Sequence, residues 1–283
     1  MTTVTTAGPK GLFADQTFIP GEVVPEALIL QLATIAGSVE GDTPVMRIPF
    51  VADDQQVGFV AEGQELDLGV PALDEVTVVT SKIALLTKMS REAYEYSQAD
   101  QLVADSMARA IADGADKAFL ANAPAAGKLP QSIGLLNTPG MLDAGELASN
   151  LDVLVDAITA VEANHGAASH LVTDPGSWAT IQKMKTAKDA NLPLVGAPAA
   201  QTGRVLLGVP VVVNPNVPAG TLLVIDKREI IAAVGDIRLD VSDQVYFSAD
   251  SIGRRASWRF GWTVVHPKRL AKVAVPVPDE PAA

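Results

Sequence analysis

The sequence predicts an α+β fold, and three stretches of the chain support this prediction. Residues Ser97 to Asn122 repeat apolar side chains every three or four positions, which is typical of an amphipathic helix of about seven turns. Residues Arg47 to Met89 contain two β-like segments around a tip rich in glycine and proline, which predicts a long hairpin. Residues 136–235 alternate short apolar strands with helices and turns, which indicates a compact α/β unit.

The N-terminal part predicts an arm and a short helix. Residues Met1 to Gly21 are rich in Thr, Gly and Pro with little periodicity, so we expect an arm held by contacts with another surface. A short apolar helix is predicted from Pro25 to Ile35.

The hairpin that follows, called the ribbon below, covers residues 46–89. Its β-like segments run from Arg47 to Glu62 and from Asp74 to Met89. An isolated two-stranded hairpin is marginally stable in water, so we expect the ribbon to lie on another surface.

The long helix has an apolar face and a charged face. Its charged face carries acid-to-base pairs four residues apart, Asp105–Arg109 and Asp113–Lys117, which stabilise a helix slightly. The predicted buried stripe consists of Val103, Met107, Ala110 or Ile111, Gly114 and Ala118.

The α/β unit follows the long helix. We expect a helix from Leu151 to Val161, a strand from His170 to Thr173, and a helix from Ser177 to Lys188. Strands at Val209 to Val213 and Leu222 to Ile225 are separated by turns rich in proline.

The last periodic segment predicts a strand with one buried and one basic face. Its apolar face carries Trp258, Phe260, Trp262 and Val264. Its other face carries Arg255, Ser257, Arg259, Gly261 and Thr263.

Composition argues against catalytic and metal chemistry. The chain has no cysteine, which excludes disulfides, thiolate metal sites and a cysteine nucleophile. His165 and His170 are five residues apart, which does not place both on one helix face. No nucleophile-elbow, phosphate-loop or dinucleotide motif occurs. We therefore predict no enzyme activity, no catalytic, cofactor-binding or metal-binding residues, and no cofactor. The apolar runs are too short to span a membrane and no signal pattern is present, so we expect a protein kept in the cytoplasm.

Charge is segregated along the chain. No basic residue lies between Arg47 and Lys82, where seven acids occur, and no acid lies between Asp250 and Asp279, where six basic residues occur. We expect the acidic ribbon of one subunit to meet the basic strand of a neighbour, although chance clustering on two solvated faces stays open. The candidate contacts are Phe59, Val60, Glu62, Glu65, Leu66 and Asp67 on the ribbon, and Arg254, Arg255, Arg259, Lys268 and Arg269 on the closing segment.

Several short motifs, in this order, resemble those of the major capsid proteins of tailed bacteriophages, which have the Hong Kong 97-type fold. The motifs are Val60-Ala61-Glu62-Gly63, Ser90-Arg91, Leu171 to Trp178, Gly208 to Val212, Val217 to Thr221 and Val264 to Pro267.

The resemblance implies a structural protein that self-assembles, as hexamers and pentamers, into the icosahedral head enclosing double-stranded DNA. It implies a location in the virion after assembly in the bacterial cytoplasm, a portal as partner, and no specific DNA binding. The implied segments are an N-terminal arm (1–45), an extended loop (46–89), a peripheral domain with the spine helix (90–135), an axial domain (136–235), and peripheral return strands with the C-terminal tail (236–283). The alternatives are an encapsulin-type nanocompartment shell and, in another class, a soluble α/β enzyme.

Two features of this sequence differ from those of some members of the family that it resembles. Some members crosslink a ribbon lysine to a neighbour, but no lysine lies between Arg47 and Lys82, and Leu66 stands about where that lysine would be. Only about 45 residues precede the ribbon, so we expect any scaffolding or cement function to come from a separate protein.

Overall fold

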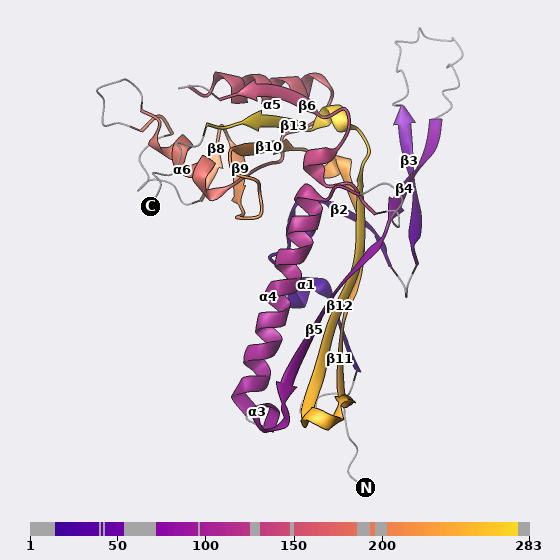
Figure 1. Cartoon of the computed structure of the whole chain (residues 1–283). Helices are drawn as coiled ribbons and strands as arrows, with labels where there is room; N and C mark the ends of the chain where they lie inside the picture. The colour runs from indigo at the N-terminus through magenta and orange to yellow at the C-terminus, as the bar shows by residue number, and fades with distance from the viewer. Residues whose placement is uncertain are drawn as a thin grey trace.

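The computed structural model describes residues 15–39, 41, 43–53, 72–95, 97–124, 131–147, 150–185, 193–195 and 203–276. Figure 1 shows an elongated subunit in which a long sheet runs beside helix α4 (Ser97–Ala121). A six-stranded sheet lies across one end of this helix, and a separate pair of strands stands beside the long sheet. This arrangement confirms the predicted α+β class.

The N-terminal segment packs along the long sheet rather than forming one helix. Its elements are β1 (Asp15–Phe18), α1 (Pro20–Val23), α2 (Leu28–Leu32) and β2 (Thr34–Ser38). The predicted helix from Pro25 to Ile35 is therefore wrong at its C-terminal end, because β2 pairs in parallel with β11 (Ile230–Tyr246). The Thr34 hydroxyl also donates to the carbonyl oxygen of Lys227 at 2.9 Å. Because β2 pairs with a strand far away in the sequence, local periodicity does not predict it.

Helix α4 confirms the predicted long helix and ends one residue before Asn122. It packs on β5 (Ser81–Ser90) and β12 (Ser251–Val264). The buried stripe passes through Ile111, whereas Ala110 is exposed. The deeply buried residues of the stripe are Met107, Ile111, Ala115 and Phe119. No helix in the described part of the chain is long and apolar enough to cross a membrane.

The long sheet has the order β1-β11-β12-β5, and β2 also pairs with β11. Strands β11 and β12 form an antiparallel hairpin around the 3-10 turn Phe247–Ala249. Trp258, Phe260 and Trp262 of β12 are buried in the core that contains the α4 stripe. The ring of Trp262 meets that of Phe119 edge-on, with centroids 5.4 Å apart. The predicted apolar face of β12 is thus confirmed.

Of the ribbon, the structure describes β3 (Val45–Asp53) and β4 (Ala72–Val79), which pair antiparallel as a separate two-stranded sheet. The predicted single segment from Asp74 to Met89 is wrong, because β4 ends before Thr80 and the chain continues as β5 at the edge of the long sheet. The Thr80 amide donates to the carbonyl oxygen of Pro44 at 2.9 Å, where the chain leaves the ribbon. β-branched and other apolar residues occur on both sides of Thr80, so the sequence pattern does not reveal the break.

The six-stranded sheet has the order β6-β13-β10-β7-β9-β8. Its strands are β6 (Leu142–Glu146), β7 (His170–Thr173), β8 (Val205–Leu206), β9 (Val209–Val213), β10 (Thr221–Ile225) and β13 (Ala271–Ala274). All five residues of β10 are buried, as expected for a central strand. Strand β13 comes from beyond the long hairpin, so a division of the chain after residue 235 leaves one strand of this sheet outside the predicted α/β unit.

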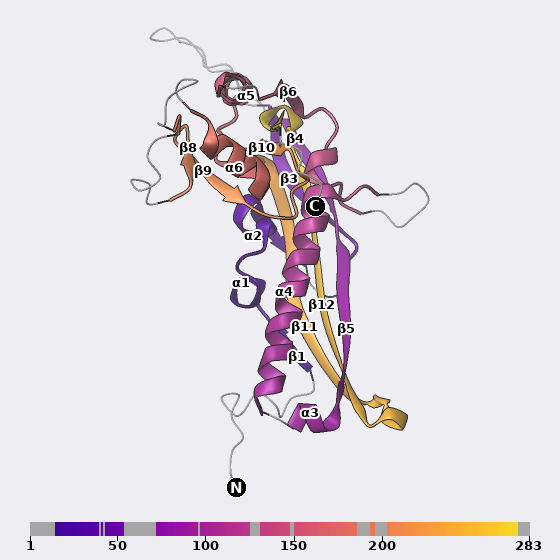
Figure 2. The same ribbon diagram turned by 60° about the vertical axis from the view of Figure 1, so that its left-hand side comes forward.

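Two helices pack on this sheet, as Figure 2 shows from a second side. Helix α5 (Asp152–Ala163) confirms the predicted second helix and buries Leu154, Ala157 and Val161. Helix α6 (Pro175–Lys183) begins two residues before the predicted Ser177 and ends before Lys188. The Asp174 side chain accepts from the Ser177 amide at 3.0 Å, so the residues that end β7 also start the helix.

Candidate assembly surface

The base of the ribbon covers part of the β12 face that the sequence predicts to be basic. A Cβ at Gly261 would lie 2.2 Å from the carbonyl oxygen of Val79, so the backbone of β4 approaches β12 at a distance that only glycine permits. The Ser132 hydroxyl donates to the Val79 carbonyl oxygen at 2.8 Å and accepts from the Trp262 amide at 2.9 Å. Backbone contacts thus hold the ribbon base to its own subunit.

Arg259 lies on the same face of β12. Its guanidinium donates to the carbonyl oxygen of Thr80 at 3.4 Å and to the Thr80 hydroxyl at 3.2 Å. The Thr80 hydroxyl donates in turn to the carbonyl oxygen of Thr43. Arg259 therefore contacts the residue at which the chain passes from the ribbon to the long sheet.

Arg254 and Arg255 lie nearer the distal end of β12. The Arg255 Nε donates to a carboxylate oxygen of Asp240, its cross-strand partner on β11, at 2.7 Å. The Arg255 side chain is still 60% exposed, which leaves its charge accessible to a second partner. The Arg254 guanidinium carbon lies 5.3 Å from the centroid of the Tyr94 ring.

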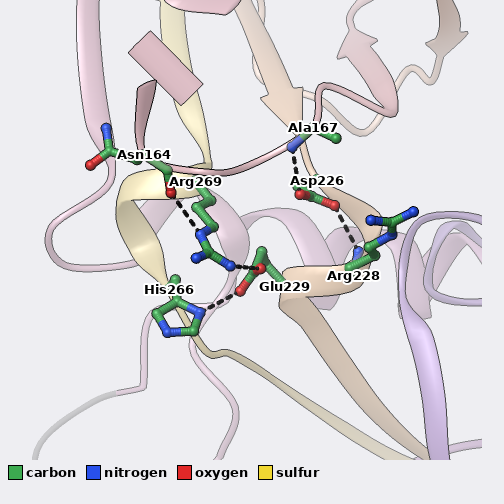
Figure 3. Close-up of polar contacts among 7 residues, drawn as sticks. All are labelled: Asn164, Ala167, Asp226, Arg228, Glu229, His266 and Arg269. Atoms are coloured by element: carbon green, nitrogen blue, oxygen red, sulfur yellow. Dashed lines mark hydrogen bonds and ion pairs between the residues drawn. The ribbon is translucent and has the colours of Figure 1, made fainter. Parts of the chain in front are cut away.

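Arg269 belongs to a polar cluster at the joint between the two large sheets (Figure 3). Its Nη1 donates to Glu229 at 2.6 Å, and its Nε donates to the carbonyl oxygen of Asn164 at 2.8 Å. The second oxygen of Glu229 lies 2.7 Å from His266 Nδ1. The cluster links the end of α5 with the chain before β11 and before β13, so it stiffens the joint.

Asp226 supports the same joint through backbone groups. Its carboxylate accepts from the amide of Ala167 at 2.7 Å and from that of Arg228 at 3.0 Å (Figure 3). Buried carboxylates satisfied in this way hold a connection in one conformation.

The structure does not bring the two predicted contact sets together. The predicted ribbon residues Phe59, Val60, Glu62, Glu65, Leu66 and Asp67 lie outside the described residues. Lys268 is exposed, whereas Arg254, Arg255, Arg259 and Arg269 contact groups of their own subunit. Contact between the two sets across subunits stays a prediction.

A buried carboxylate that the sequence analysis missed lies where α4 meets α2. Asp116 is 5% exposed. One oxygen accepts from the Leu28 amide and the other from the side-chain amide of Asn214, each at 2.7 Å. Burial raises the pKa of Asp116 to about 6, although both hydrogen bonds act to lower it. The available signal was an acid three residues before the buried Phe119, on the apolar side of the helix.

Asp113, almost one turn earlier, joins the same connection. It accepts from Lys117 at 2.7 Å, which confirms the predicted pair, and from the Asn216 side chain at 2.9 Å. The hydrogen bonds from Lys117 and Asn216 lower the pKa of Asp113. Two carboxylates of α4 thus hold the turn that follows β9.

These residues line an open cavity of about 950 Å³ between α4, the segment of α1 and α2, and β9. Its lining mixes acidic and apolar side chains with the basic Arg109 and Arg204. Among the described residues, no group of three or more His, Asp or Glu side chains could hold a metal ion. The arrangement joins segments of the subunit and offers no recognisable set of reacting groups.

Comparison with known proteins gives a consistent result. A family model described as the phage capsid family matches residues 16–275. No curated protein matches the chain in sequence.

Solved structures share the fold at low sequence identity. The capsid of a native GTA particle, computed with C5 symmetry, has a TM-score of 0.67 and 20% identity over 97% of this chain and 99% of that chain. A chain of Mycobacterium phage Bobi has a TM-score of 0.66 and 17% identity over 96% of each chain. A chain of Microbacterium phage Oxtober96 has a TM-score of 0.69 and 14% identity over 88% of this chain and 91% of that chain.

Proposed function

The chain belongs to the phage capsid family, and from this premise we propose that its copies self-assemble, as hexamers and pentamers, into the closed icosahedral head of a tailed phage. The family match identifies a structural major capsid protein located in the virion. Its role is structural, as the family implies. The encapsulin-type shell is not favoured, because the matching family model is that of phage capsids.

The observation that carries this proposal is the extent of the family match. The matched residues 16–275 run from β1 to just beyond β13, so they include the long helix, the ribbon and both large sheets. The GTA particle that shares this fold was computed with C5 symmetry, and this supports rings of five copies among the assemblies proposed here.

We assign each segment of the subunit one part of the shell. Residues 1–45 form the arm, 46–89 the extended loop, 90–135 the peripheral domain with α4, 136–235 the axial domain, and 236–283 the return strands and tail, with β13 completing the axial sheet. Two large hydrophobic cores accompany this division. One lies between α4 and the long sheet and also takes in Val172, Leu223 and Ile225 of the six-stranded sheet, and the other lies within the six-stranded sheet.

The ribbon of one subunit would lie over a neighbour. A two-stranded sheet is marginal by itself, and the close approach of Val79 to Gly261 and its hydrogen bond from Ser132 hold the ribbon base. The predicted apolar residues Phe59, Val60 and Leu66 would supply burial at about 25 cal/mol per Å² of apolar area. Glu62, Glu65 and Asp67 would meet exposed cations such as Lys268 and Arg255, each pair contributing about 0–1 kcal/mol.

Other partners follow from the same role. The shell would enclose double-stranded DNA without gripping it, because a chain of net charge -12 repels phosphate. A portal, and a separate scaffolding or cement protein, would complete the head.

Electron microscopy and sedimentation of the purified protein test the assembly. We expect closed shells or rings of copies, and no turnover traceable to the protein's own residues. A single monomeric species under native salt conditions would count against the proposal.

The ribbon contact has a separate test. Lys268→Glu should reduce assembly at low salt while leaving the fold of the subunit unchanged, because it places a negative charge where the acidic ribbon is expected. Arg238→Glu, at an exposed position of β11, is the control with the same change in charge. Salt of about 1 M shortens the Debye length to about 3 Å, so the difference in assembly between Lys268→Glu and the control should become smaller. Equal assembly of both variants at low salt would argue against Lys268 as a contact.

A further inference from the structure

One edge of the six-stranded sheet is acidic. Strand β6 is its first strand, and α5 packs on β6 and β13. The chain has no lysine or arginine between Lys128 and Lys183. The exposed acids of this edge are Asp143, Glu146, Asp152, Asp156 and Glu162.

The outer face of α5 combines this charge with apolar surface. Asp152, Val155 and Asp156 are all exposed, and their spacing places them on one side of the helix. Val155 is 46% exposed, and the opposite side of α5 is buried on the sheet. An apolar side chain among charges on an exposed face is a composition suited to protein contact.

The opposite edge of the same sheet is basic. Strand β8 is its last strand, and both views place α6 beside β8 and β9 (Figures 1 and 2). Between Asp174 and Asp226 the chain contains one acid, Asp189. Exposed basic residues here are Lys183, Lys185 and Arg204, and exposed apolar residues are Val205 (43%) and Leu207 (46%).

The two edges cannot meet within one subunit. Five strand spacings separate β6 from β8, which is about 24 Å at about 4.8 Å per spacing. A second copy in the same relative orientation can bring its basic edge to the acidic edge of the first. A contact between two different surfaces of identical chains repeats from copy to copy and closes into a ring when the rotation fits.

We propose that the acidic β6–α5 edge of one subunit binds the basic β8–α6 edge of the next, and that this contact closes the rings of the shell. The proposal rests on the proposed function, since it names the surface through which neighbouring copies join. Complementary charge directs the edges to each other and disfavours acidic-to-acidic or basic-to-basic contacts. The exposed Val155, Val205 and Leu207 lose contact with water in the joined state.

Charge reversal at one edge tests the contact. The acidic-edge variant carries Asp152→Lys and Asp156→Lys, and the basic-edge variant carries Lys183→Glu and Arg204→Glu. The control carries Asp236→Lys and Asp243→Lys, exposed positions of β11 with the same change in net charge as the acidic-edge variant. Circular dichroism and the unfolding midpoint of each subunit verify the fold, and native mass spectrometry counts the copies per ring.

Each edge variant alone should form at least about tenfold fewer rings than the parent at low salt, because the two reversals remove most of the charge that attracts that edge to the opposite edge of the next copy. The control should form rings as the parent does. An equal mixture of the two edge variants should recover rings, in which the variants alternate. Those rings should contain equal numbers of the two variants and an even number of copies.

Three results would overturn the proposal: edge variants that form rings as well as the parent, a mixture that does not recover, or a control that loses rings to the same extent. If the parent and both edge variants each assemble equally well, the edge contact is wrong but the proposed shell function stands. A parent that stays monomeric overturns both.

Discussion

Asp116, within α4, accepts a hydrogen bond of 2.7 Å from the side-chain amide of Asn214, which follows the last residue of β9. The bond joins the helix of one hydrophobic core to a strand of the other. Because the carboxylate is buried, this connection is sensitive to the protonation of a single group.

Asp116 should make the stability of the subunit depend on pH. Its folded pKa of about 6 lies above the ordinary 3.8, so the folded state binds this proton more tightly than the unfolded state. The contribution is fully present below about pH 4 and is lost as the pH rises through 6, by on the order of 3 kcal/mol. Urea unfolding of monomeric subunits should show that Asp116→Asn removes this dependence.

Asp113→Asn is the control for that measurement. The pKa of Asp113 is lowered, so its contribution is present above its ordinary pKa and is lost as the pH falls. This variant should keep most of the loss of stability between pH 4 and 7, because burial raises the Asp116 pKa more than the charge of Asp113 does. If the difference between parent and Asp116→Asn stays constant over that range, the role given to Asp116 is wrong.

Glu229→Gln should destabilise the joint between the sheets. The side chain of Arg269 is 22% exposed and that of Glu229 is 9% exposed, so the substitution leaves a largely buried cation without its counter-charge. We expect a loss of about 2–4 kcal/mol in the free energy of unfolding. Asp243→Asn, at an exposed position of β11, should change it by no more than about 0.5 kcal/mol. Equal effects of the two variants would show that the cluster contributes little.

Replacing glycine by alanine should destabilise the subunit at Gly261 and stabilise it at Gly114. Gly261→Ala places a Cβ 2.2 Å from the carbonyl oxygen of Val79, so β4 or β12 must shift, and we expect destabilisation of about 1–3 kcal/mol. Gly114→Ala, within α4, meets no atom within 4 Å and should stabilise by about 0.5–1 kcal/mol. Thermal unfolding of both variants checks the pair. Stabilisation by Gly261→Ala would refute the close approach of the ribbon base.

Assembled shells should contain no covalent bond between subunits through the ribbon. The segment between Arg47 and Lys82 has no lysine and thus no side-chain amine for an isopeptide bond. Boiled shells should run on a denaturing gel as one band near 29.5 kDa. A ladder at multiples of that mass would contradict this expectation.

Sequence alone determined the elements whose signal is local. Helix α4 and the alternation of Trp258, Phe260 and Trp262 in β12 follow from periods of 3.6 and 2, which a single segment displays by itself. Strands β7 and β9 follow from short apolar runs bounded by turn residues. The grouping of basic residues after Asp250 is likewise a property of one continuous segment, so the order of residues reveals it directly.

Only the tertiary structure decided how these parts pair. Contacts between segments far apart in sequence determine the break at Thr80 and the return of β13 to the six-stranded sheet. They also determine the partners of Arg255 and Arg269. The same holds for Asp116, whose two donors lie 88 and 98 residues away. Periodicity predicts which face of an element is apolar. The geometry of the folded chain determines which strands pair and which group binds a buried charge.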